Sequence, residues 1–297
     1  MDVDGDGFKD IVVAPHPGDP MYWYENPRGA NTHWASHEIT PAGVAGLETP
    51  IVVDVFGDGR PRLVMSDAVE QSLGWYEPPA DPRQPWTQMS ISGPRFPGAG
   101  LFVHGIGLGD VDGDGKLDVL TGYGWYQQTS VHGTGGSHPF SFGPNLCSRM
   151  FAYDVDGDGL ADVLCGNPHD YGLHYWKQAR ATNGADLTFT EYPIDDSISQ
   201  LHALRLDDLD GDGVPEIITG KRWLAHTQIR DPGDADPAVL TFFKLRRRVG
   251  GAVTFERHDV DEDSGVGTQF AVGDVDGDRK ADIVTSNKKG LFLFHQR

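Results

Sequence analysis

The residues best suited to chemistry in this sequence are aspartates at alternate positions of a short segment that contains glycine. Asp110, Asp112, Asp114 and Asp118 occupy its first, third, fifth and ninth positions, and Gly115 occupies the sixth. Ca²⁺ takes about six to eight oxygen ligands at roughly 2.4 Å, and a D-x-D-x-D-G loop turns three carboxylates inward around its glycine. Because carboxylates this close repel one another strongly, the segment predicts a bound cation.

The same segment recurs along the chain, so internal repetition is the first feature to establish. Together the complete copies predict about five Ca²⁺ sites, whose charge would offset much of the formal net charge of −20. The predicted ligands are Asp2, Asp4, Asp6 and Asp10; Asp110, Asp112, Asp114 and Asp118; Asp154, Asp156, Asp158 and Asp162; Asp208, Asp210, Asp212 and Glu216; and Asp274, Asp276, Asp278 and Asp282.

A sixth copy begins at Asp54 but lacks two of its acids. Phe56 takes the third position and Arg62 the ninth, while Asp54 and Asp58 remain. We expect this loop to bind no calcium, and the Arg62 guanidinium to pair with the remaining carboxylates instead. In the last copy Arg279 replaces the glycine, which should strain the turn by about 1 kcal/mol.

Composition and motifs narrow the classes of protein. Lys and Arg number 24 against 44 Asp and Glu, and their one cluster is 246–248, which argues against a nucleic-acid partner. No run of about 18 apolar residues is present, so no membrane span is expected. Motifs G-x-S-x-G and H-E-x-x-H are absent, which removes the commonest serine hydrolase and zincin interpretations.

No signal peptide is visible, but low-affinity calcium loops work best where calcium is millimolar, which favours a secreted or periplasmic protein.

Short β-branched runs bounded by Gly and Asp flank the acidic segments and predict strands, whereas helical periodicity is absent. Four strands per repeat of about 45 to 65 residues predict an all-β fold: a β-propeller of six or seven four-stranded blades, in one domain spanning 1–297. The expected strands include 50–53, 101–108 and 270–272 before the loops; 10–13, 118–121 and 216–219 after them; the aromatic runs 22–25, 74–77, 124–127 and 174–177; and 34–39, 86–91, 189–194 and 255–260.

These loops resemble those of the FG-GAP/VCBS repeat family, which also occur in the heads of integrin α-subunits. The resemblance covers nearly the whole chain and implies a calcium-binding propeller, usually of seven blades. Six loops are visible here, so either six blades close with an incomplete seam or one blade is missing. Met1 lies directly against the first loop without the strand expected before it, which favours a chain trimmed at its N-terminus.

Polar residues are expected to gather on the propeller face opposite the calcium loops, where innermost strands begin and second strands end. Propeller channels are wet, so a polar residue there needs no function, but the grouping predicts one catalytic or metal site. Six places before the first Asp of a loop are Glu48, His104, Ser148, His202 and Thr268, with Arg149 and Gln269 next in sequence to two of them. The loops after second strands add His16, Asp67, Tyr123, His169, Tyr171, Lys221, Arg222, Trp223 and His226.

On this face the residues would surround the mouth of the central propeller channel. An imidazole or tyrosinate there could abstract a proton beside a carboxylate, and an arginine or a metal could stabilise the resulting enolate. This is lyase or dehydratase chemistry. The chain is similar to polysaccharide lyases and to a fungal anhydrofructose dehydratase of this architecture. Under this hypothesis, the predicted placement of the residues makes His104 or His202 the base, Tyr171 the acid and Arg149 the clamp, with His169 as a further catalytic candidate.

The other polar residues of this face are candidates for binding a carbohydrate, and Trp223 and Tyr171 are the candidates for stacking on a sugar. A Zn²⁺ ion held by Glu48, His104 and His202 is an alternative use of the same channel mouth.

Two non-catalytic alternatives are a lectin and an integrin-like adhesion module. A lectin would usually repeat its sugar site between blades, whereas these residues differ from blade to blade, which favours one site and an enzyme. The substrate-binding candidates are Glu48, Lys221, Arg222, Trp223, His226 and Gln269.

Two further features carry expectations. Cys147 and Cys165 flank the loop that begins at Asp154. Strand pairing would set Cys165 opposite residues near Met150, so two buried free thiols are expected in preference to a disulfide. The insertion 222–237 is too long for a simple turn and predicts a lid over the channel.

Overall fold

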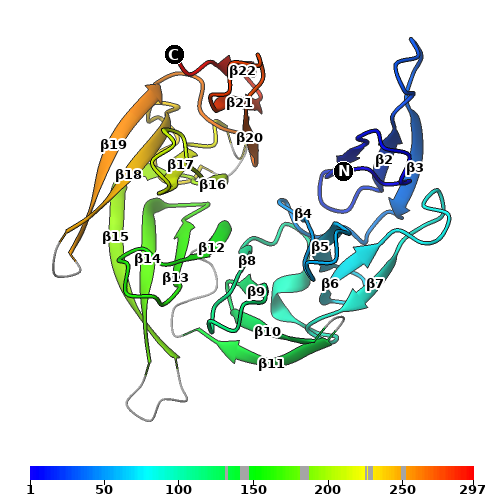
Figure 1. The fold of residues 1–297 in the computed structure, drawn as a ribbon, viewed down its shortest axis with the longest axis horizontal. Helices are drawn as coiled ribbons and strands as arrows, with labels where there is room; N and C mark the ends of the chain where they lie inside the picture. The colour runs from blue at the N-terminus through cyan, green and yellow to red at the C-terminus, as the bar shows by residue number, and fades with distance from the viewer. Residues whose placement is uncertain (131–132, 141–146, 181–186, 225, 227–229, 249–251) are drawn as a thin grey trace. The chain divides into compact units, whose positions relative to one another are not determined.

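A computed structural model describes every residue except 131–132, 141–146, 181–186, 225, 227–229 and 249–251 (Figure 1). The described residues fold as β-strands joined by turns, with one short 3-10 helix, η1 (Pro97–Ala99). They divide into two compact units: the first unit comprises Met1–His104 and Lys116–Pro139, and the second unit Gly105–Gly115 and Phe140–Arg297. No helix in the described parts of the chain has the length and hydropathy needed to cross a membrane.

In the first unit, strands that follow one another in the sequence pair antiparallel. This is the order that the repeated strand runs predicted. The strands are β1 (Ile11–Val13), β2 (Met21–Glu25) and β3 (Ala35–Thr40) in one sheet; β4 (Ile51–Val53), β5 (Arg62–Asp67), β6 (Ser72–Glu77) and β7 (Thr87–Ser90) in the next; and then β9 (Asp118–Thr121), β10 (Gly124–Ser130) and β11 (Gly133–Pro139).

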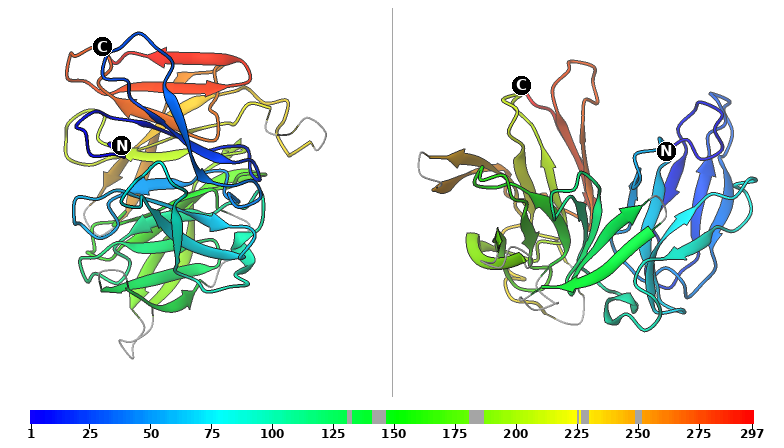
Figure 2. Two further views of the ribbon diagram at one scale, coloured as in Figure 1. Left: turned by 90° about the vertical axis from the view of Figure 1, so that its right-hand side faces the viewer. Right: turned by 60° about the horizontal axis from the view of Figure 1, so that its bottom comes forward.

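The second unit repeats this arrangement with longer outer strands. β14 and β15 have 10 and 13 residues, so they extend well beyond the five-residue strand β12 (Figures 1 and 2). β8 (Ile106–Gly109) pairs in parallel with β12. The remaining strands are β12 (Arg149–Tyr153), β13 (Asp162–Gly166), β14 (Tyr171–Arg180) and β15 (Leu187–Ser199); β16 (Leu204–Asp207), β17 (Glu216–Gly220), β18 (Leu240–Arg247) and β19 (Val253–Asp261); and β20 (Phe270–Gly273), β21 (Asp282–Asn287) and β22 (Gly290–Phe294).

One predicted strand begins later than expected. The run 101–108 is apolar, but the strand β8 starts only at Ile106. Phe102 has φ of 59° and Gly105 has φ of 81°, both in the left-handed region that ends an extended chain. The apolar pattern therefore identified the strand, and backbone conformation decided where it starts.

The aromatic third strands are packing elements. Trp23 of β2 is fully buried and Trp75 of β6 is 2% exposed. The indole Nε1 of Trp23 donates a hydrogen bond to the Pro82 carbonyl, 3.1 Å away in the connection between β6 and β7. The indole therefore ties two neighbouring sheets of the first unit together, as expected for inter-blade packing rather than a sugar platform.

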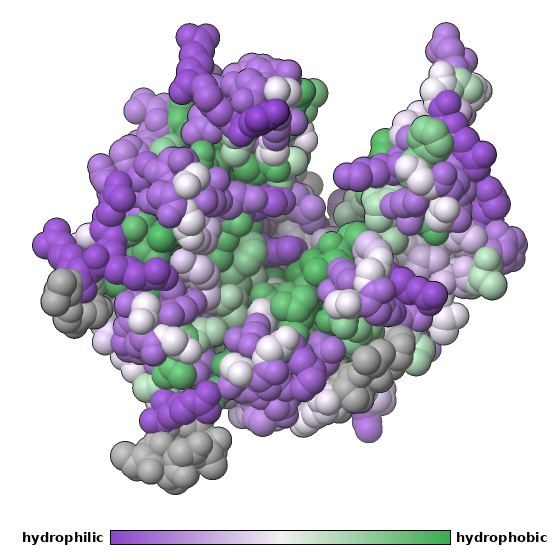
Figure 3. All heavy atoms as spheres, in the orientation of Figure 1, coloured by the Kyte–Doolittle hydropathy of each residue, from purple (hydrophilic) through white to green (hydrophobic). Residues whose placement is uncertain are grey.

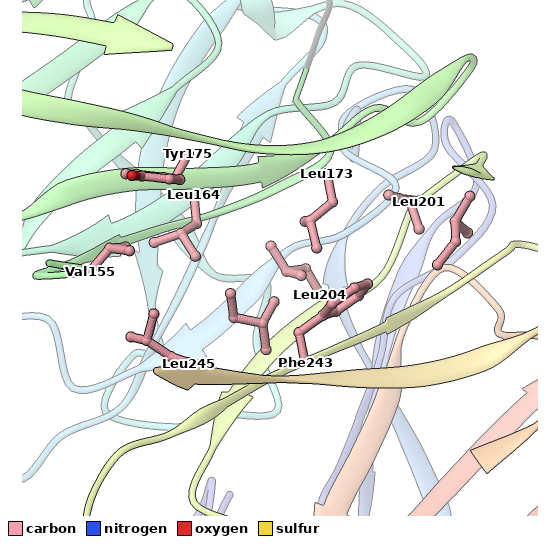
Figure 4. Packing of buried hydrophobic residues seen from close by; sticks show 10 residues of the cluster. Val155, Leu164, Leu173, Tyr175, Leu201, Leu204, Phe243 and Leu245 are labelled. Atoms are coloured by element: carbon pink, nitrogen blue, oxygen red, sulfur yellow. The ribbon is translucent and has the colours of Figure 1, made fainter. Parts of the chain in front are cut away.

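Hydrophobic side chains from two sheets form a continuous core in the second unit (Figure 4). Leu164 and Leu173 come from the sheet β12–β15, and Leu204 and Phe243 come from the sheet β16–β19. All four are at most 3% exposed. Each such leucine or phenylalanine contributes about 1.5–3 kcal/mol by leaving water, so this packing holds the two sheets face to face.

Hydrophobic surface also remains exposed, and Figure 3 shows it among hydrophilic residues on one face. In the first unit, Ile11 is 50% exposed, Val13 41% and Val52 42%. These residues lie on the short strands β1 and β4. Their exposure agrees with the rule that a single apolar residue at a surface needs no special explanation.

Cys147 and Cys165 form a disulfide, so the expectation of two free thiols was wrong. The predicted register is present, since Met150 pairs with Cys165. The residues before Met150 do not continue away along the partner strand, because the Ser148 amide donates to Gly166 and the Ser148 hydroxyl donates to Leu201. This bend brings the Cα of Cys147 to 5.2 Å from that of Cys165, within disulfide range.

Candidate functional site

Each acidic loop is wrapped around its first carboxylate. In the loop at Asp2, this side chain accepts the backbone amides of Gly5, Asp6 and Gly7 at 2.9–3.1 Å. The loop at Asp154 repeats the pattern with the amides of the same three loop positions. Gly5 and Gly7 have φ of 74° and 89°, which explains why glycine occupies these positions.

The ninth carboxylate connects the loop with the third strand of its sheet. Asp162 is fully buried and accepts the Val155 amide at 3.0 Å and the Gln178 amide at 2.8 Å. Strand register explains the position, because Asp162 pairs with Tyr153 directly before the loop. Asp10 and Asp282 make the same two kinds of contact. The carboxylate at the ninth position therefore also links the loop to the third strand by hydrogen bonds. The spacing of the acids did not reveal this structural role.

Burial raises the pKa of Asp162 to about 6, although its two amide hydrogen bonds act in the opposite direction. The neighbouring carboxylates of Asp156 and Asp158 raise it further. A divalent cation or a proton at this position would relieve that repulsion.

The carboxylates of the first loop fit a calcium ion in spacing. One oxygen from each of Asp2, Asp4 and Asp6 lies within 4.8 Å of the other two. Two ligands on opposite sides of a Ca²⁺ ion are about 4.8 Å apart, because each Ca–O distance is roughly 2.4 Å. These three side chains could therefore contact one ion with little rearrangement.

Cationic side chains lie against several of these loops. Lys177 contacts Asp156 and lies 3.1 Å from Asp158. Lys244 Nζ lies 2.5 Å from Asp210 Oδ2. These side chains offset part of the repulsion between carboxylates, and they would have to compete with a metal ion or move aside for it.

The loop at Asp54 is completed by an arginine, as predicted. The two terminal nitrogens of Arg62 each lie 2.8 Å from one oxygen of Asp58, in a bidentate pair, and Nη1 lies 3.8 Å from Asp54. Arg62 Nε also donates to Glu77, 2.5 Å away, and the guanidinium lies over the Phe56 ring at 4.6 Å. The pKa of Asp58 is held well below its usual range, mainly by the hydrogen bond from Arg62.

Arg279 adopts the backbone conformation of the glycine that it replaces, with φ of 71°. Its amide still donates to Asp274, so the loop keeps its hydrogen-bond pattern. The backbone strain predicted for this turn is therefore located at Arg279, which lies in the left-handed region.

The second polar region lies at the opposite ends of the strands. In a sheet of consecutive antiparallel strands, the connection between the second and third strands is at the other end from the acidic loop. In the second unit this end carries Arg149 at the start of β12, His169 after β13, Tyr171 at the start of β14, His202 before β16, and Lys221 after β17. His104, Glu48, His16 and Asp67 belong to the first unit.

Three imidazoles and a carboxylate meet in the second unit. The His169 ring stacks on the His226 ring with centroids 5.0 Å apart, and the ring of the buried His202 lies 5.3 Å from that of His169. Asp231 Oδ2 lies 3.3 Å from His169 Nδ1 and 2.8 Å from His226 Nδ1. We call His169, His202, His226 and Asp231 the imidazole cluster.

The segment Asp231–Asp236 is fastened to this end of the strands. The ammonium of the buried Lys221 donates to the carbonyls of Gly233 and Asp236, and Gln200 donates to the Asp234 carboxylate at 2.7 Å. The Tyr171 hydroxyl donates to the Asp236 carboxylate at 2.5 Å, which raises the pKa of Tyr171. Gly233 has φ of 78°, and a Cβ there would lie 2.3 Å from the Ser199 hydroxyl oxygen.

Part of the predicted lid 222–237 lies outside the described residues, namely 225 and 227–229. Before them, Trp223 is half-buried beneath the Lys289 ammonium, 5.4 Å from its ring. The Arg222 amide donates to the Gln200 carbonyl. Gln269 is exposed.

Arg149 is a predicted site residue that carries a charge in a partly buried position. Its guanidinium lies 5.7 Å from the Phe151 ring, and no carboxylate among the described residues forms an ion pair with it. Burial, and secondarily the charge of Arg205, lowers the pKa of Arg149 to about 10. An arginine in this position has unused capacity to bind an anion.

Sequence reasoning missed Asp231, Asp236 and Gln200, which hold or complete this region. The signal in the sequence is the run Asp231-Pro232-Gly233-Asp234 within the insertion 222–237, which contains Asp231 and ends two residues before Asp236. A cavity of about 230 Å³ elsewhere in the second unit is lined mainly by apolar residues, including Phe242, Ile283 and Phe294. None of the predicted catalytic residues lines it.

The fold and the loops together define an all-β repeat protein in which hairpins carry acidic D-x-D-x-D-G loops. The FG-GAP-like repeat family matches residues 2–65 and 154–219, and the FG-GAP repeat family matches residues 102–137. The chain belongs to the FG-GAP repeat proteins, as its acidic loops predicted. No curated protein matches the sequence.

Two similar solved structures are the biofilm matrix protein Bap1 of V. cholerae and the Tc holotoxin pore of Photorhabdus luminescens. The Bap1 match is 19% identical with a TM-score of 0.37, and it covers 92% of this chain and 40% of that one. The toxin match is 17% identical with a TM-score of 0.44, and it covers 99% of this chain and 14% of that one. The chain therefore spans less than half the length of either protein.

Proposed function

We propose that this protein is a calcium-stabilised β-propeller of six or seven blades that acts on an acidic carbohydrate by elimination, at one site opposite its calcium loops. The calcium part is supported by the 4.8 Å grouping of Asp2, Asp4 and Asp6 oxygens. The family and the recurrence of the loop support extending this to the other four complete copies.

The observation that carries the carbohydrate proposal is the guanidinium of Arg149, which forms no ion pair with a carboxylate among the residues that the structure describes. A uronate carboxylate is a planar anion that an arginine binds in a bidentate manner, and the partial burial of Arg149 strengthens this contact because water competes less. In this proposal Arg149 binds the carboxylate and stabilises the enolate that forms when the neighbouring proton is removed. Within the second unit, His202 acts as the base, and Tyr171 protonates the leaving oxygen.

The experiment is an absorbance assay for unsaturated sugar products with a panel of uronate polysaccharides and keto sugars, in the presence of calcium. We expect turnover of at least one uronate, and a loss of at least 100-fold in kcat/KM for Arg149→Lys, which keeps a charge but lacks the planar fork. Arg246→Lys, at a largely exposed arginine near the end of β18, is the matched control and should leave turnover unchanged. Absence of turnover with every substrate would overturn the proposal.

Carbohydrate binding without catalysis is the second candidate. It is favoured by the complete burial of His202 and by the contact of the Tyr171 hydroxyl with Asp236, since both limit proton transfer to a substrate. A glycan array that reports binding at several equivalent sites, together with no turnover, would support this lectin function. Binding at one site with turnover would support the enzyme.

A secreted or periplasmic location is part of the proposal. The disulfide between Cys147 and Cys165 supports it, because disulfides persist in oxidising compartments. Millimolar calcium is found in the same compartments, where loops of low affinity would be occupied.

A further inference from the structure

We propose that His169, His226 and Asp231 bind one transition-metal ion of the Zn²⁺ class, at a site separate from the calcium loops. One potential ligand atom of each residue lies within 4.8 Å of the other two. All three residues are partly buried and belong to the second unit. The inference does not depend on the proposed carbohydrate chemistry, because metal binding needs no substrate.

The distances fit a small tetrahedral ion. His169 Nδ1 lies 3.3 Å and His226 Nδ1 lies 2.8 Å from the same oxygen, Asp231 Oδ2. Two ligands of a tetrahedral Zn²⁺ ion are about 3.3 Å apart, since each bond is roughly 2.0–2.1 Å long. The ion would therefore take the place of the protons that these nitrogens share with the carboxylate, and the side chains would move by a few tenths of an ångström.

The donor types select the class of metal. Two imidazole nitrogens and one carboxylate oxygen suit Zn²⁺ and its neighbours, whereas Ca²⁺ prefers a shell made only of oxygens. The His169 and His226 rings are nearly parallel, with an interplanar angle of 23°, so their Nδ1 atoms can face one ion from the same side. The His202 ring lies 5.3 Å from the His169 ring, at an angle of 88°, and adds a third imidazole to the surroundings.

The ligands are held by different parts of the fold. His169 lies in the turn between β13 and β14, while His226 and Asp231 lie in the connection between β17 and β18. Lys221 and Gln200 fasten the residues that follow Asp231, so the carboxylate does not depend on the metal for its place. Three protein ligands leave a fourth position for water or for an anionic group of a ligand.

The alternative is an ion pair in which Asp231 accepts hydrogen bonds from two histidines and binds no metal. The two arrangements differ in a measurable way, because Zn²⁺ binds neutral imidazole and releases protons, whereas an ion pair needs protonated imidazole. Metal affinity should therefore rise as the pH increases through the range in which histidine titrates.

The test begins with protein freed of metal by a chelator and returned to millimolar calcium, so that the loops are not available to the second metal. Zn²⁺ is then titrated into the full chain by calorimetry at pH 7.5. We expect one Zn²⁺ per chain, with affinity lowered at least 10-fold by Asp231→Asn and by His226→Ala. His258→Ala is the matched control, because His258 is a half-exposed histidine of the second unit paired with Glu256, and it should bind as the parent does.

Cobalt(II) provides an independent measurement. Co²⁺ in the site should give the intense visible absorption of a tetrahedral complex, and Zn²⁺ should displace it. Asp231→Asn changes only the charge of the carboxylate and keeps its shape, so it remains informative if His226→Ala fails to fold. The proposal is overturned if the parent protein binds no Zn²⁺ in the presence of calcium, or if Asp231→Asn and a folded His226→Ala bind it as tightly as the parent. Failure of the carbohydrate assay would leave this result unaffected.

Discussion

Arg62 shows at the scale of one residue how a side chain can occupy the place of an ion. Its side chain is 3% exposed and joins Asp58, Asp54 and Glu77, which would otherwise repel one another. Because an arginine replaces the acid at the ninth position, we expect this loop to keep its fold without calcium. The pairing could be predicted from the sequence because all loop positions are close along the chain. The contact with Glu77 could not, because it depends on the pairing of β5 with β6.

Replacing this arginine should therefore destabilise the protein in the presence or absence of calcium. Arg62→Ala leaves the carboxylates of Asp58 and Glu77 facing each other without a counter-charge, and we expect a loss of about 3 kcal/mol in the free energy of unfolding. Urea denaturation of both proteins measures it. Arg60→Ala, in the same loop but with an exposed side chain, is the control and should change stability by less than about 0.5 kcal/mol. Equal stability of Arg62→Ala and the parent protein would contradict the prediction.

At the scale of elements, the hairpin β12–β13 is closed at both ends. The acidic loop and Asp162 fix one end, and the disulfide between Cys147 and Cys165 fixes the other. The hairpin also supplies Leu164 to the core between two sheets. We therefore expect a substitution at either end of this hairpin to disturb the packing of Leu164 in the core between the two sheets.

Removal of the disulfide should lower stability through the unfolded chain. The cysteines are separated by 18 residues, and closing a loop of this length stabilises by about 3 kcal/mol in the chain-entropy account. We expect the double variant Cys147→Ala and Cys165→Ala to melt at a lower temperature, measured by circular dichroism. The parent protein under reducing conditions should show the same decrease, whereas the double variant should not respond to reductant. A response of the variant would mean that the reductant acts elsewhere.

For the whole molecule, we expect the acidic loops to make stability depend on calcium and pH together. Asp162 has a folded-state pKa of about 6, raised by burial above its ordinary value of 3.8. The calcium-free folded protein therefore binds a proton more tightly than the unfolded chain and gains stability from this group as the pH falls from 6 to 3.8. A calcium ion that binds at Asp162 would have to displace that proton, so we expect its contribution to stability to increase with pH.

We expect calcium to raise the melting temperature more at pH 7.5 than at pH 5, and the chelator EDTA to lower it at pH 7.5. At 100 times its dissociation constant, one ion stabilises the folded state by about 2.7 kcal/mol. Differential scanning calorimetry with calcium or EDTA at both pH values measures the effect, and magnesium in place of calcium is the control. A melting temperature that does not respond to calcium at pH 7.5 would refute the assignment of the loops.

The sequence by itself determined the repeat, the strand runs, the acidic loops and the substitution at Arg62, because each depends on residues close along the chain. Only the tertiary structure decided three other features: the disulfide, the burial of Asp162 between its loop and β14, and the meeting of His169, His226 and Asp231. The residues of that cluster are up to 62 positions apart in the sequence. Sequence spacing carries no information on such contacts, because they arise from how separate sheets pack and how a long connection folds back over strand ends.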